Sequence, residues 1–123
     1  MPKGLVWVEP AKNDLNELVE YIAFHDSADK AMSIFEKVTS QAENIVNFPE
    51  KGRIVPELKQ IGVLTYFEKI QAPYRIVYRI FEAHIFIVAV LDGRRDLGEM
   101  LMERARRGWW WAWMFKFRYA EFM

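Results

Sequence analysis

The alternation of apolar and polar positions along the chain predicts two amphipathic helices near its start. Over residues 10–24, apolar side chains recur every three or four positions, after a short β-prone run at 6–8 and with Pro10 in the first turn. A second stripe of the same period begins after a break at 25–27 and stops before Pro49. Because the break is so short, the two helices are expected to form an antiparallel hairpin.

The middle of the chain changes to a pattern typical of strands. Residues 51–62 contain two glycines and a proline and predict a loop. Strands are expected over 64–71, 74–80 and 85–91, and the last is an unbroken apolar run, as in a strand buried on both faces. The short links between the three indicate an antiparallel meander. Apolar spacing over about 97–105 predicts a final short helix.

These elements, in the order β-αα-βββ-α, define an α+β fold in which a helical hairpin packs on a small, mostly antiparallel sheet. Pairing of the helices with each other cannot bury both apolar stripes, so a flat surface must lie beneath them. A length of 123 residues is that of one domain, which we assign to residues 1–107. No apolar run reaches the ~18 residues of a membrane-spanning helix and no signal-peptide pattern is present, which indicates a soluble cytoplasmic protein without a membrane partner.

Residues 108–123 form an aromatic-rich C-terminal tail in which half of the side chains are aromatic. Between Trp113 and Tyr119, aromatic residues alternate with others, which is the period of a strand with one apolar face. Three interpretations stay open. The tail is a further strand that covers exposed core, a segment that binds a partner or a membrane interface, or an extension of the reading frame that no selection has shaped.

The net charge of the chain is zero, but its two halves differ in sign. Residues 1–50 carry four basic and nine acidic side chains, and residues 51–123 carry thirteen basic and eight acidic ones. The basic half indicates an anionic partner such as a nucleic acid or an acidic peptide. Alternatively, the two halves neutralise each other within the fold.

The chain lacks the residues that most catalytic mechanisms need. The chain has no cysteine, no Gly-rich phosphate loop and only two histidines, His25 and His84, far apart in the sequence. Its serines have no base nearby in the sequence, so nucleophilic catalysis has no visible support. No metal and no other cofactor is therefore expected.

The informative polar residues are arginines in and after the predicted strands. Alternation along 74–80 puts Arg75 and Arg79 on one face and the tyrosines on the other. Arginine at strand ends can grip phosphate or carboxylate groups bidentately, and Arg94, Arg95 and Asp96 follow the last strand directly. In the alternative, the arginines pair within the chain and only orient loops. The acidic residues available for such pairing are Glu57, Glu68, Asp92, Asp96 and Glu99.

Four strings of residues occur together and in order. They are EPAKNDL at 9–15 with YIA at 21–23, FPEKGR at 48–53 with VPEL at 55–58, YRIVYRI at 74–80 and VAVLDGRRDL at 88–97. In this combination the chain, from about residue 5 to residue 107, resembles the ParE/RelE superfamily of type II toxin–antitoxin toxins. The resemblance implies the same order of helices and strands. It also implies a bacterial, cytoplasmic toxin of the plasmid-stabilisation type, in a hetero-oligomer with a cognate antitoxin whose acidic segment suits the basic half.

Two activities occur in this superfamily. RelE-like members cut mRNA on the ribosome, which requires a general base and cations that stabilise the crowded phosphate. Arg75 and Arg94 match the two arginines of that site, and Lys69 is adjacent to the strand positions of its lysines. Those positions fall near Tyr66 and Glu68, and the position of a downstream tyrosine falls near Met100. The resemblance therefore implies an incomplete ribonuclease site.

ParE-like members instead inhibit DNA gyrase by binding and need no catalytic residues of their own. The long helical hairpin, the GRRD string and the incomplete acid–base set favour this branch, so we predict a gyrase inhibitor that is not an enzyme. The residues expected to contact a partner or to shape the contact surface are Arg75, Arg79, Arg94, Arg95, Asp96 and Tyr78. The alternatives are a RelE-like, ribosome-dependent mRNA endoribonuclease and an inactive toxin homologue.

Overall fold

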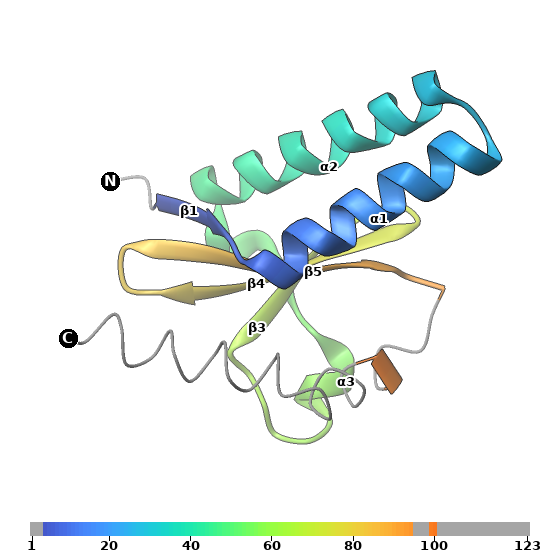
Figure 1. Ribbon diagram of the computed structural model, residues 1–123. Coiled ribbons are helices and arrows are strands. Elements are labelled where there is room, and N and C mark those ends of the chain that lie inside the picture. The colour runs from blue at the N-terminus through green and yellow to red at the C-terminus, as the bar shows by residue number, and fades with distance from the viewer. Residues whose placement is uncertain (1–3, 95–98, 101–123) are drawn as a thin grey trace. The chain divides into compact units, whose positions relative to one another are not determined.

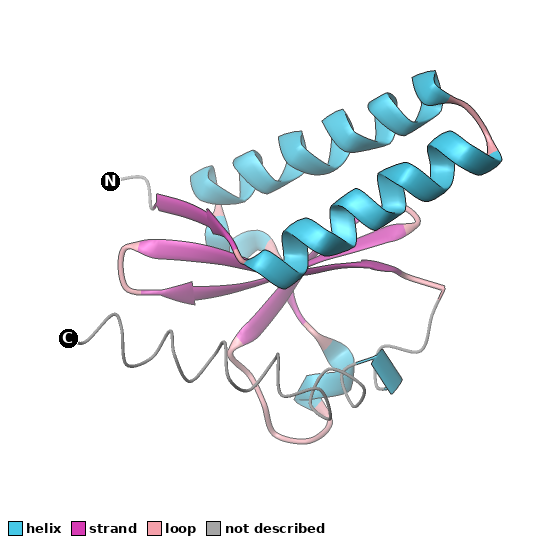
Figure 2. Cartoon of the chain, viewed as in Figure 1, coloured by secondary structure: helices cyan, strands magenta, loops and turns pink. Residues whose placement is uncertain are grey.

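A helical hairpin lies on one face of a five-stranded sheet in the computed structural model of the protein (Figure 1). The structure describes residues 4–94 and 99–100. The helices and strands named below belong to one compact unit, residues 1–93. Figure 2 distinguishes the helical layer in cyan from the sheet in magenta. The arrangement confirms the α+β fold predicted from the sequence.

The hairpin consists of α1 (Glu9–His25) and α2 (Ala28–Asn47), close to the predicted bounds. Pro10 stands in the first turn of α1, where its missing N–H group costs nothing. The Ser27 hydroxyl oxygen caps α2 by accepting a hydrogen bond from the backbone N–H of Lys30 at 3.0 Å. These local signals fix where one helix stops and the next begins.

The strands follow the order β1-β5-β4-β3-β2 across the sheet. Their bounds are β1 (Gly4–Trp7), β2 (Arg53–Ile54), β3 (Tyr66–Gln71), β4 (Tyr74–Phe81) and β5 (His84–Asp92). Strands β3, β4 and β5 pair antiparallel and confirm the predicted meander. Strand β1 runs parallel to β5, which places Gly4–Trp7 beside the last strand of the described residues.

The core lies between the hairpin and the sheet. Strand β5 is buried on both faces, as its unbroken apolar run predicted. Tyr74 of β4 packs with Ile22 of α1 and Ala31 of α2, so its side of β4 faces the helices. Since side chains alternate along a strand, Arg75 and Arg79 occupy the opposite face.

The prediction of a loop over 51–62 is wrong in part. Strand β2 pairs with β3 there, and the short helix α3 (Pro56–Lys59) follows it. Pro56 begins α3, because its ring holds the backbone angle that a first helical position needs. A two-residue strand forms only where a neighbour supplies the pairing, so its own residues carry no signal for it. The next strand also begins at Tyr66, two residues later than predicted.

No helix within residues 4–94 and 99–100 is long and apolar enough to cross a membrane. Glu99 and Met100 are helical. The rest of the helix expected over 97–105, and the tail at 108–123, lie outside the described residues.

Candidate functional site

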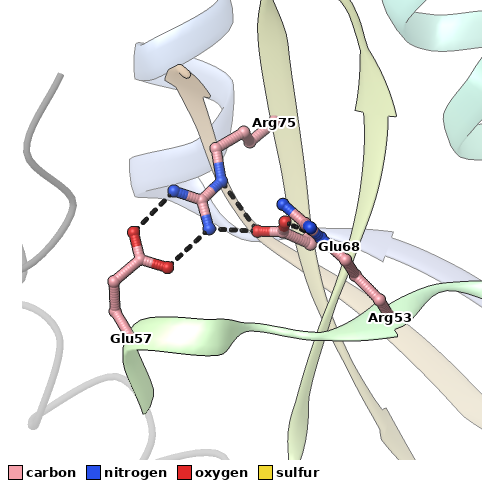
Figure 3. A network of polar contacts seen from close by, with 4 residues as sticks. All are labelled: Arg53, Glu57, Glu68 and Arg75. Atoms are coloured by element: carbon pink, nitrogen blue, oxygen red, sulfur yellow. Dashed lines mark hydrogen bonds and ion pairs between the residues drawn. The ribbon is translucent and has the colours of Figure 1, made fainter. Parts of the chain in front are cut away.

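Four charged side chains form a continuous network on the face of the sheet away from the hairpin (Figure 3). The Nη1 and Nη2 atoms of Arg75 donate to the two carboxylate oxygens of Glu57 at 2.7 and 2.8 Å. The Nε atom of Arg75 donates to Oε1 of Glu68 at 2.7 Å, and Nη2 also donates to that oxygen. Nε of Arg53 donates to Oε2 of Glu68 at 2.6 Å. We call these residues the arginine–glutamate network.

Each member of the network comes from a different element. Arg53 of β2 and Glu68 of β3 stand directly opposite each other in their ladder, so their side chains share a face. Arg75 lies on the neighbouring strand β4, and Glu57 reaches it from the first turn of α3. The short elements β2 and α3 therefore position two of the four side chains.

The centre of the network, Glu68 and Arg75, is shielded from water, whereas Arg53 at its edge is exposed. The side chain of Glu68 is 0% exposed and that of Arg75 is 10% exposed. Charges this deeply buried persist only when they are paired and hydrogen-bonded. Hydrogen bonds from Arg75 hold the pKa of Glu57 below its usual value, and the bonds to Glu57 are also the largest cause that raises the pKa of Arg75. Arg75 therefore stays charged, with four of the five N–H donors of an arginine in use.

In the ribonuclease alternative, Lys69 and Arg75 belong to one site. In the structure, Lys69 lies on the face of the sheet opposite to that of Arg75. Lys69 stands opposite Ile76 in the β3–β4 ladder, whereas Arg75 stands opposite Ile70. Side chains of opposite residues share a face, so Lys69 and Arg75 point to opposite sides of the sheet. Lys69 lines a cavity next to α2 instead. The sheet thus separates two of the three residues of that set.

Tyr78 and Arg79 have different surroundings although they are neighbours in β4. Tyr78 is completely buried, and its hydroxyl donates to the backbone oxygen of Pro49 at 2.7 Å. A ring without exposed surface cannot touch a partner, so Tyr78 can only shape a contact surface by holding the chain after α2. The guanidinium carbon of Arg79 lies 5.8 Å from the ring centroid of Tyr66 and 5.7 Å from that of Phe81, which are cation–π distances.

The remaining residues of the predicted site follow β5. Arg94 is exposed, and Arg95 and Asp96 lie outside the described residues. Within residues 4–94 and 99–100, no group of three or more His, Cys, Asp or Glu side chains is placed to hold a metal ion.

Arg75 forms ion pairs within the chain, which is one of the two alternatives that the sequence left open. Glu57 and Glu68 are among the five acidic residues that the sequence offers as partners. Arg53 was missed. Its only signal would have been its register opposite Glu68, and that register depends on β2, which the sequence did not predict.

A family model described as the ParE toxin of the type II toxin–antitoxin system parDE matches residues 5–97, most of the chain. The chain belongs to the ParE toxin family. The match confirms the resemblance to the ParE/RelE superfamily. One relative in the ParE family, Toxin ParE3 of Caulobacter vibrioides, is 24% identical over 97 residues, which cover 79% of this chain and 93% of the relative.

Two solved structures share the fold of this ParE family member. One is the chromosomal ParDE toxin–antitoxin system from P. aeruginosa, with a TM-score of 0.60, 17% identity, and coverage of 72% of this chain and 92% of that chain. The other is the toxin–antitoxin complex RelBE2 from Mycobacterium tuberculosis, with a TM-score of 0.54, 19% identity, and coverage of 73% and 96%. Because ParDE and RelBE2 both match, the fold alone does not separate the two activities of the superfamily.

Proposed function

We propose that this ParE family protein is a toxin that inhibits DNA gyrase by binding and that a cognate antitoxin neutralises it. The observation that carries the proposal is the separation of Lys69 from Arg75 by the sheet, with Arg75 already held by two carboxylates. Cleavage of a phosphodiester needs cations that converge on one phosphate. A binding role makes no such demand, so the arrangement supports inhibition without catalysis.

Two observations support an antitoxin as the partner. The similar structures belong to the ParDE and RelBE2 toxin–antitoxin systems. The second half of the chain carries thirteen basic against eight acidic residues, which suits an acidic peptide that folds on binding. In this proposal Arg79, Arg94, Arg95 and Asp96 contribute to the contact surface. Arg75 and Tyr78 act on it only through their internal contacts.

The test uses the purified full-length chain with DNA gyrase and supercoiled plasmid. The expected result is conversion of the plasmid to linear DNA, while mRNA on ribosomes stays intact. An equimolar amount of the cognate antitoxin should prevent the conversion. Specific cutting of ribosome-bound mRNA, without any effect on gyrase, would support the RelE-like alternative. No response in either assay would support an inactive homologue.

Substitutions then locate the contact surface. Arg79→Ala is expected to raise the toxin concentration needed for linearisation about tenfold, as arginines at binding hot spots do. Lys59→Ala removes an equal charge from an exposed position on α3 and serves as the matched control. Thermal melting of both variants distinguishes a lost contact from a lost fold.

A further inference from the structure

A cavity of about 360 Å³ lies between the end of α2, the segment that follows it, and strand β3. Gln41, Asn44 and Asn47 of α2 line one side of it. Lys69 lines it from the helical face of the sheet, so it is on the other side of the sheet from the arginine–glutamate network. The proposed inhibition of gyrase makes no use of this cavity.

The cavity has a positive lining. Lys51 and Lys69 both contribute to it, and no acidic residue is among the described residues that line it. In the part of the chain that the structure describes, neither lysine forms an ion pair with a carboxylate. Lys69 is also half-buried, and it lines the cavity together with Lys51. An anion in the cavity would be attracted by both ammonium groups.

Neutral hydrogen-bond donors and an aromatic ring at the cavity indicate which class of anion would bind there. The amides of Asn44, Asn47 and Gln41 offer N–H donors but add no charge. Phe48 lies at the cavity with 60% of its surface exposed, and the Lys51 ammonium lies 4.4 Å from the centroid of its ring. An exposed ring next to a cation is a surface on which a planar base can stack beside its own phosphate.

We propose that this cavity binds a nucleoside monophosphate, with its phosphate between Lys51 and Lys69 and its base against Phe48. A phosphate monoester carries a charge of about −1.5 to −2 at neutral pH, which two ammonium groups neutralise. Lysine is a common phosphate ligand, which it binds as a compact point charge. The volume is within the range of about 300–1,000 Å³ of small-molecule sites.

Calorimetric titration of the full-length chain tests the proposal with AMP, GMP, CMP and UMP, and with adenosine and inorganic phosphate as partial ligands. At least one monophosphate should bind saturably, about tenfold more tightly than phosphate, and adenosine should bind more weakly still. Lys51→Ala and Lys69→Ala should each weaken nucleotide binding about tenfold. Phe48→Ala should weaken nucleotide binding and leave phosphate binding unchanged. Lys59→Ala, which removes a lysine outside the cavity, should change neither.

Amide NMR of the unmodified chain keeps the test decisive if a variant fails to fold. Nucleotide should shift the resonances of Lys51, Gly52 and Lys69 more than those of the network residues on the other face. The proposal is overturned by the absence of saturable binding for all four nucleotides, or by equal affinity for nucleotide and inorganic phosphate. Equal binding by Lys69→Ala and Lys59→Ala, or shifts confined to other parts of the chain, would overturn it as well.

Discussion

Lys69 and Arg75 lie on opposite faces of one sheet, although β3 and β4 are adjacent strands joined by a tight turn. Arg75 is enclosed with two glutamates, and Lys69 faces the helical layer and an open cavity. The two faces therefore have different roles. One carries the neutral arginine–glutamate network, and at the other Lys51 and Lys69 line a cavity without an ion pair to a carboxylate among the described residues.

Loss of Glu68 should destabilise the fold strongly. Glu68→Ala leaves the buried guanidinium of Arg75 with only Glu57, and it removes the partner of Arg53. Breaking a buried ion pair from one side costs about 3–5 kcal/mol. Urea denaturation measures the change in the free energy of unfolding. Glu20→Ala, at an exposed position of α1, should change it by less than about 0.5 kcal/mol. A similar small effect of Glu68→Ala would contradict the structural role of the network.

Glu57 should make stability depend on pH in the acid range. Its pKa in the folded protein lies below the unfolded value of 4.5 because Arg75 donates hydrogen bonds to it. Its contribution to stability is therefore complete above that value and is lost as the pH falls through the lower folded pKa. Glu57→Gln should lower the free energy of unfolding at pH 7 and flatten its decline between about pH 5 and pH 3. Denaturation curves at several pH values check this, and parallel acid limbs for both proteins would contradict it.

Loss of the Asp14 carboxylate should destabilise the protein, because this side chain accepts a hydrogen bond from β5 beyond the end of β1. Strand β1 pairs with β5 only as far as Ile87, and the backbone N–H of Val90 donates to Oδ2 of Asp14 at 3.0 Å instead. Asp14→Ala leaves that buried N–H without its acceptor, which costs about 1–3 kcal/mol. Amide hydrogen exchange at Val90 should accelerate in this variant. Asp14→Asn, which keeps an acceptor oxygen, should show a smaller effect; equal acceleration in both would argue against the hydrogen bond.

Gly52 should tolerate no side chain. A Cβ atom there would lie 2.1 Å from the hydroxyl oxygen of Tyr78 and 2.9 Å from the backbone oxygen of Glu68. Gly52→Ala should therefore destabilise the protein by about 1–3 kcal/mol through overpacking. Tyr78→Phe removes the closest of these atoms, so the double variant should be more stable than the sum of the two single changes predicts. Strict additivity in thermal or urea unfolding would show that the contact is not the cause.

The sequence signals that the structure confirms are local. The stripe of apolar residues in α1 and α2, the stop at Pro49 and the continuous apolar run of β5 each depend on neighbours within a few positions. The placement of Arg75 and Arg79 on one face follows from the two-residue period of a strand. By contrast, β2 and α3 are too short to have a period, so the sequence pattern predicts a loop for the segment that carries Arg53 and Glu57.

The sequence by itself determined the family, the helical hairpin, the meander and the placement of Arg75 and Arg79 on one face of β4. Only the tertiary structure decided that Arg75 is held by Glu57 and Glu68, and that Lys69 meets α2 rather than Arg75. The physical reason is that ion pairing and cavity lining depend on the register between strands and on how residues 49–59 fold back against them. Those relationships join residues that are distant in the chain, and no pattern of neighbouring residues encodes them.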